Sequence, residues 1–320
     1  MKDARWESLF PERYPPDLRL GEIMARTRLR GLEIGGIQIG IEVPETFEWE
    51  WPESPVSEFQ CLPREPEVHI GLRVDTPGND DLGGERYSVG AWTFEVARHG
   101  RDWVLGLSKG GRRAQLAHFD REFQTGEIIV SPEMAAKRAY PLRGPIDEWI
   151  VLHRTVARGG LCLTGSAMAL DGKAIIQLGE PESGGGNRSV TPSTSLLGRS
   201  SLLLREEREQ LRLFRTPWAD SIDPRLPFES RVAELRRTQD SERAFSDLLD
   251  PADAADLLVT HAVVPLCDDA LLDRVLRNAQ RIAQGTRVVD LGRAATATDA
   301  PMAWQSTQMQ SAFAPPRGGL

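Results

Sequence analysis

The most distinctive stretch of the sequence is the loop Gly179-Glu-Pro-Glu-Ser-Gly-Gly-Gly-Asn-Arg188, and two apolar segments precede it. Residues 161–170 and 173–178 are rich in leucine, isoleucine and alanine, and Asp171-Gly172 separates them. An Asp-Gly pair between two such segments favours the tight turn of a β-hairpin. The pattern therefore predicts a strand, a turn, a second strand and then a glycine-rich loop.

A glycine-rich loop directly after a strand is typical of a phosphate-binding P-loop, because its backbone N–H groups can surround anionic oxygens. Aligning Gly179 and Gly184 with the glycines of G-x-x-x-x-G-K-[ST] places Gly185 at the lysine position and Gly186 at the hydroxyl position. Both functional side chains are absent. Residues 190–195 are β-branched or hydroxyl-bearing with one proline, which is a poor start for the helix that a P-loop needs behind it. We interpret the four glycines as a remnant phosphate-binding loop.

The motifs around the loop follow a characteristic order. A helix at residues 145–158 precedes Gly159-Gly160, the first strand, an Asp-Gly-Lys turn and the glycine-rich loop, and Arg215-Thr-Pro-Trp218 follows later. This order resembles that of HPr-kinase-related proteins over residues 140–291, about half of the chain. The resemblance implies a PEP-carboxykinase-like nucleotide fold that uses ATP and magnesium to phosphorylate a serine of a protein or peptide.

The residues to which the resemblance would assign catalysis are all replaced. The family's histidine corresponds to Thr164, its P-loop lysine to Gly185, and its paired aspartates to Arg199 and Ser200. Phosphoryl transfer depends on a metal ion and on positive charge around the transferred group. We therefore expect no catalytic residue, no bound metal and no cofactor.

The expected fold is α+β in several parts. Residues 1–30 predict an N-terminal lead with a short helix at 17–30. Residues 31–140 predict a small antiparallel β domain, because segments such as 32–43 and 68–74 alternate apolar and polar residues. Residues 141–298 would form the HPr-kinase-like α/β domain. Residues 299–320 are rich in Gln, Ser, Pro and Gly and predict a disordered tail.

Helix-capping residues place the helices of the second domain. Pro145 suits the first turn of one helix, and Asp250-Pro251 suits the start of another that reaches about residue 264. Asp268 is expected to cap a third, which Gly285 ends before a strand at 287–291.

Composition excludes several classes of function. The net charge of −8 argues against non-specific binding to nucleic acid or to anionic membranes. No segment approaches the eighteen or so apolar residues of a spanning helix, and no signal sequence opens the chain. Cys61, Cys162 and Cys267 lie too far apart for a zinc motif or a disulfide framework. A cytoplasmic location is expected.

Other candidate residues have simpler interpretations. His153 and His261 are expected to be packed histidines, and the pairs Asp147-Glu148 and Asp268-Asp269 open helices, where the helix dipole favours carboxylates. Trp49 and Trp51 belong to an acidic, aromatic stretch, which either covers the core or recognises a partner.

Two hypotheses for function remain. In the first, the chain is a pseudokinase that serves as a scaffold or binding subunit for a protein or peptide partner. In the second, it is an ATP-dependent serine kinase with an atypical P-loop, in which Arg188 replaces the lysine. Arg188 lies three residues beyond Gly185, and the magnesium ligands are missing as well, so the sequence favours the scaffold.

Overall fold

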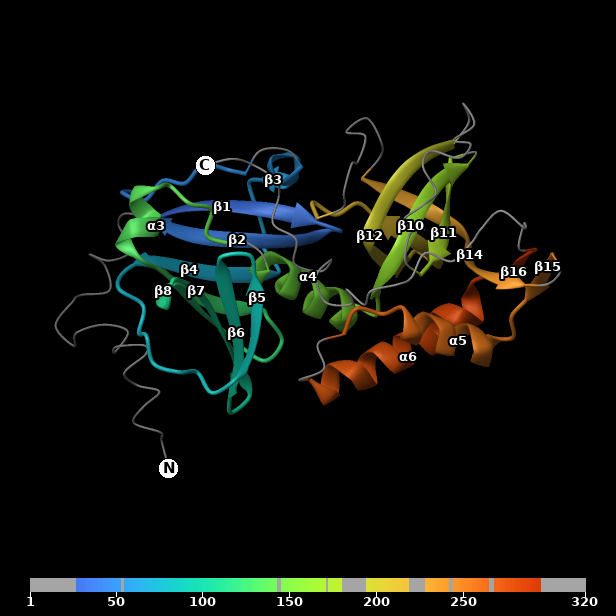
Figure 1. Ribbon diagram of the computed structural model, residues 1–320. Helices are drawn as coiled ribbons and strands as arrows, with labels where there is room; N and C mark the ends of the chain where they lie inside the picture. Colours follow the sequence, from blue (N-terminus) through green and yellow to red (C-terminus); the bar gives the residue numbers. More distant parts are fainter. Residues whose placement is uncertain are drawn as a thin grey trace. The chain divides into compact units, whose positions relative to one another are not determined.

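The computed structural model describes residues 27–52, 55–142, 145–170, 172–179, 194–218, 228–241, 244–264 and 268–294 (Figure 1). They belong to two compact units, here called unit 1, up to Ile150, and unit 2, from Val151. The division falls within helix α4 (Ile146–Ala157), about ten residues after the boundary expected at residue 140.

Unit 1 is built on a nine-stranded sheet in the order β3-β1-β2-β4-β9-β8-β7-β6-β5 (Figure 1). Its strands are β1 (Thr27–Ile34), β2 (Ile37–Pro44), β3 (Gln60–Cys61), β4 (Val68–Val74), β5 (Glu85–Val89), β6 (Trp92–His99), β7 (Asp102–Lys109), β8 (Arg112–Phe119) and β9 (Thr125–Val130). Most neighbouring strands are antiparallel, but β4 is parallel to both β2 and β9. The sheet is therefore mixed, whereas the alternating sequence predicted an antiparallel one.

The helix predicted at residues 17–30 is wrong where the structure describes it, because residues 27–30 belong to strand β1. β1 pairs with β2 as an antiparallel hairpin, and Gly35 and Gly36 turn the chain with φ of +59° and +70°. Two consecutive positive φ values suit the type I′ hairpin turn, which glycine adopts without strain. The cross-strand ladder thus outweighs the helix-like spacing of the apolar residues. Residues 17–26 lie outside the described part of the chain.

A buried ion pair fastens the loop of residues 77–84 to the sheet. Arg113 on β8 donates from Nη2 to Oε2 of Glu95 on β6 over 2.9 Å, and the two side chains are 3% and 7% exposed. The same guanidinium donates to the carbonyl oxygens of Gly78 and Asp80. These contacts hold the loop against the sheet.

Two short helices and the first turns of α4 complete unit 1. The 3₁₀ helix η2 (Val56–Phe59) precedes β3, and α3 (Pro132–Ala136) follows β9. In α4, the Trp149 ring lies 5.6 Å from the Trp103 ring and 6.2 Å from the Phe94 ring, measured between centroids. The prediction of a helix with an apolar face is confirmed.

Unit 2 contains seven strands in the order β11-β10-β12-β13-β14-β16-β15. They are β10 (Leu161–Leu170), β11 (Lys173–Leu178), β12 (Thr194–Glu207), β13 (Gln210–Phe214), β14 (Glu229–Ser241), β15 (Phe245–Leu248) and β16 (Val288–Ala294). β11 also pairs with β14 in parallel, so that the first five strands of this order close into a barrel (Figure 1). β16 and β15 extend the sheet beyond β14.

The predicted α+β fold with a PEP-carboxykinase-like α/β domain is therefore wrong. The described chain is mostly strand, with a large sheet in unit 1 and a β-barrel in unit 2. The long strand β14 explains much of the difference, because it pairs with β11, β13 and β16. Its sequence is rich in charged residues and carries no clear strand signal.

Two helices, α5 (Pro251–Thr260) and α6 (Asp269–Gly285), pack against each other in unit 2. The predicted cap of α5 is confirmed: Asp250 Oδ1 accepts from the backbone N–H groups of Ala252 and Asp253 over 2.8 and 3.0 Å. Asp268 is the N-cap residue of α6, as predicted, but its side chain makes no capping hydrogen bond.

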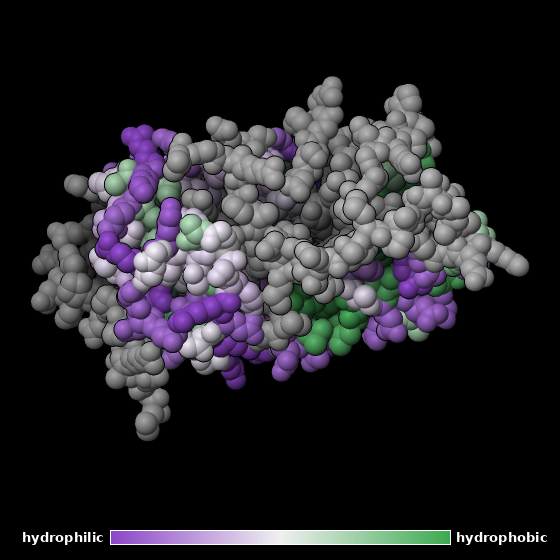
Figure 2. All heavy atoms as spheres, in the orientation of Figure 1, coloured by the Kyte–Doolittle hydropathy of each residue, from purple (hydrophilic) through white to green (hydrophobic). Residues whose placement is uncertain are grey.

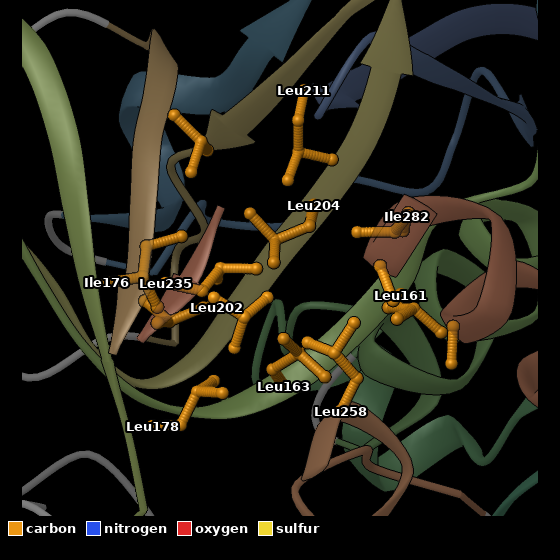
Figure 3. Packing of buried hydrophobic residues seen from close by; sticks show 14 of the residues in the cluster. Leu161, Leu163, Ile176, Leu178, Leu202, Leu204, Leu211, Leu235, Leu258 and Ile282 are labelled. Carbon is orange, nitrogen blue, oxygen red and sulfur yellow. The ribbon is translucent and has the colours of Figure 1, made fainter. Parts of the chain in front are cut away.

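Buried leucines and isoleucines join the barrel of unit 2 to its helices. Leu161 and Leu163 of β10 lie in one apolar cluster with Leu258 of α5 and Ile282 of α6 (Figure 3). Asn278 of α6 adds two hydrogen bonds, in which its Nδ2 donates to the carbonyl oxygens of Val156 and Gly160 over 2.9 and 3.0 Å. The start of β10 is thereby held on the helices. None of the described helices is both long and apolar enough to cross a membrane.

Candidate functional site

The candidate site lies at the end of β11, where the glycine-rich loop begins. Gly179 is the first of the predicted loop glycines and has a φ of +100°. Residues other than glycine adopt this backbone conformation only with strain. Its N–H donates to the carbonyl oxygen of Thr164 over 3.4 Å. Gly184, Gly185 and Gly186 lie outside the described residues, so the remnant P-loop itself stays a prediction.

Strand register brings the three predicted positions together. Gly165 on β10 pairs with Leu178 on β11 and with Ser200 on β12, so Thr164 and Ser200 lie on adjacent strands and Gly179 directly follows the strand on the other side of β10. Arg199, on the same strand as Ser200, pairs with Ser166. The positions that the resemblance selected are thus neighbours, although the fold that it implied is wrong.

His261 also lies next to these residues, and no pattern in the sequence indicated this position. It follows the last residue of α5, and its carbonyl oxygen accepts from the backbone N–H of Thr164 over 2.8 Å and from its Oγ1 over 3.2 Å. A methyl group added to Gly179 would lie 3.6 Å from His261 Cε1. Burial, and secondly the nearby Arg237 guanidinium, lower the pKa of His261, which favours its neutral form. The contact depends on how the end of α5 meets β10, which no local motif indicates.

The arginine that contributes to the lowered pKa of His261 is itself paired with a carboxylate. Arg237 on β14 donates from Nε to Oδ1 of Asp290 on β16 over 3.0 Å and from Nη2 to Oδ2, which makes a bidentate pair. Hydrogen bonding to Asp290 raises the pKa of Arg237. Gln239 also donates to Asp290 Oδ2 over 3.0 Å. The guanidinium charge is therefore compensated by a carboxylate within the site.

Besides the Arg237–Asp290 pair, the described residues near Gly179 include several neutral hydrogen-bonding side chains. Thr164, Thr238 and Gln239 are exposed, and Gln177 is half-buried. Thr238 Oγ1 donates to Gln177 Oε1 over 3.1 Å, so the hydroxyl of β14 is tied to β11. Such groups both donate and accept hydrogen bonds and carry no charge.

The remaining candidate acids and histidine lie on other elements. His153 on α4 and Asp268 before α6 are both buried, with 4.0 Å between Nδ1 and Oδ2, in keeping with the packed histidine expected. Glu148 is half-buried on α4, and burial, followed by the charge of Asp147, raises its pKa to about 8. Within the described ranges, no three His, Cys, Asp or Glu side chains are grouped as a metal site would require.

Trp49 and Trp51 surround a single guanidinium. Arg30 Cζ lies 4.0 Å from the centroid of the Trp49 ring and 5.0 Å from that of Trp51, within cation–π distance of both. Trp49 is buried, whereas Trp51 is half-buried and contacts Tyr140. Trp49 therefore covers the core, as the simpler interpretation predicted.

Comparison with known protein families finds no match for this sequence, and no curated protein matches it either.

Proposed function

We propose that this chain is a non-catalytic binding protein of the cytoplasm, which holds a protein or peptide partner at the β11 end of its barrel. We further propose that it is a degenerate relative of the HPr-kinase-related proteins that its motif order resembles. The fold that this resemblance implied is wrong, so the proposal rests on the residues of the site.

The observation that carries the proposal is the chemistry gathered around Gly179. Thr164, Gly179 and Ser200, which the motif order aligns with the family's histidine, P-loop and aspartate, lie on or next to three neighbouring strands. Gly185 and Gly186 stand at the lysine and hydroxyl positions of the loop. Phosphoryl transfer needs positive charge and a held metal ion at these positions, and the nearby Arg237 is committed to Asp290.

The same surface suits a polypeptide better than a phosphate. A polypeptide presents alternating N–H and C=O groups, and the exposed hydroxyl and amide side chains of this site can bond to both kinds. The Arg237–Asp290 pair leaves little net charge, so recognition would depend on hydrogen bonds and shape rather than on electrostatic attraction.

A matched pair of glutamine variants tests the location of the binding surface. Gln239→Arg adds bulk and charge at the site while keeping a donor that can reach Asp290, and Gln284→Arg makes the same change at an exposed position of α6. Tagged wild-type protein and the Gln284 variant are expected to capture the same partner from the source cells, and the Gln239 variant to lose it. Equal capture by both variants, with circular dichroism showing that both are folded, would place the partner elsewhere.

A further inference from the structure

Helix α6 exposes two leucines beside its buried face. The buried residues are Leu271, Val275, Asn278, Ala279, Ile282 and Ala283. Leu272 and Leu276, four residues apart and therefore on one side of the helix, are 38% and 39% exposed. Figure 2 shows hydrophobic side chains gathered at the lower middle of the view, where Figure 1 places α6.

The charged residues next to these leucines are acidic in the first half of the helix and basic after it. Asp269 and Asp273 are exposed in its first half, and Arg277 is exposed one turn after Asp273. If two such helices run antiparallel, the acidic half of each lies against the basic residue of the other. The stripe is therefore complementary to itself, and this property selects a second copy of the same chain as the partner.

We propose that α6 pairs antiparallel with α6 of a second copy, about a two-fold axis that passes near Arg274. This axis places Leu272 against Leu276 of the second copy, and the symmetry repeats the contact. It also brings Asp273 within one helical turn of Arg277 of the second copy. The interface is separate from the proposed peptide site, because it uses neither β11 nor Gly179.

The apolar centre is small, with two leucines from each copy. Interfaces of this size form weak, transient complexes rather than permanent ones. We therefore expect a reversible dimer with a dissociation constant on the order of micromolar. Because exposed charges contribute, added salt should weaken the dimer.

A charge exchange tests the antiparallel pairing. Asp273→Arg and Arg277→Asp are each expected to weaken the dimer about tenfold, because one substitution changes two symmetric contacts. The double variant restores opposite charges across the axis and should dimerise like the wild type. Sedimentation equilibrium over a concentration series measures all four proteins.

A leucine pair supplies the matched control. Leu276→Gln should abolish dimerisation, whereas Leu248→Gln on β15, which removes a leucine that is 68% exposed, should leave it unchanged. Circular dichroism checks that every variant is folded. A wild-type protein that stays monomeric at all concentrations, or a double variant no stronger than the single ones, would overturn the proposal.

Discussion

Replacement of Arg113 by methionine is expected to lower the free energy of unfolding of unit 1 by about 1–3 kcal/mol, because the buried carboxylate of Glu95 loses one of its two arginines and keeps only Arg86. The Glu95 side chain is 7% exposed and that of Arg113 is 3% exposed, so water can replace little of the lost contact. The carbonyl oxygens of Gly78 and Asp80 lose a donor at the same time. Urea unfolding followed by tryptophan fluorescence measures the change.

The neighbouring residue and the ion-pair partner provide the controls. Arg112→Met changes the adjacent arginine, whose side chain is 84% exposed, and should shift stability by less than about 0.5 kcal/mol. Combining Arg113→Met with Glu95→Leu removes both charges and should recover much of the loss, since buried ion pairs often tolerate apolar replacement. If the single and double variants are equally unstable, lost packing rather than the lost pairing of the Glu95 carboxylate accounts for the destabilisation.

Glu148→Gln is expected to stabilise the protein at pH 8 and to change little at pH 5. The raised pKa of about 8 means that the folded state holds a proton that the unfolded state releases above about pH 4.5. Stability therefore falls as the pH rises through this window, by at most about 1.4 kcal/mol per pH unit. Solvent contact of the half-buried side chain reduces this slope. Glutamine cannot ionise, so the variant should lose the slope that Glu148 contributes.

The measurement is a series of urea titrations between pH 5 and pH 8.5. Glu65→Gln alters an exposed glutamate of the same unit and serves as the control. It should follow the wild-type pH dependence, while Glu148→Gln should be flatter. Parallel curves for all three proteins would show that Glu148 ionises normally in the folded state.

Local sequence signals predicted single elements well. Asp250-Pro251 placed the start of α5 correctly, and the apolar face around Trp149 identified α4. Each of these elements depends on contacts between residues close in sequence, such as an N-cap bond or a helical stripe. Such signals predict how elements pack together only where the packed elements are also consecutive in the sequence.

The fold class could not be obtained in this way, because long-range pairing decides it. The parallel pairing of β11 with β14 closes the barrel across more than fifty residues. The motif order suggested instead an α/β domain, since a hairpin, a glycine-rich loop and later helices are compatible with several topologies. No residue pattern in β14 specified its three partner strands.

The sequence named Gly179 as a loop glycine and Thr164 and Ser200 as aligned positions, and adjacent strands bring these residues near one another. The other predicted loop glycines, Gly184, Gly185 and Gly186, lie outside the described residues and stay predictions. His261 and the Arg237–Asp290 pair were missed, because they come from a helix end and from strands distant in sequence. The neutral character of the site follows from these contacts rather than from any motif.

Isothermal titration of the full-length protein with ATP, in magnesium and again in EDTA, tests the central claim most directly. Gly185 and Gly186 stand at the positions that the P-loop pattern gives to a lysine and a magnesium-binding hydroxyl, and Arg237 is paired with Asp290. We therefore predict no measurable binding at physiological ATP concentrations. Saturable, micromolar binding of ATP that requires magnesium would contradict the account and favour an active kinase.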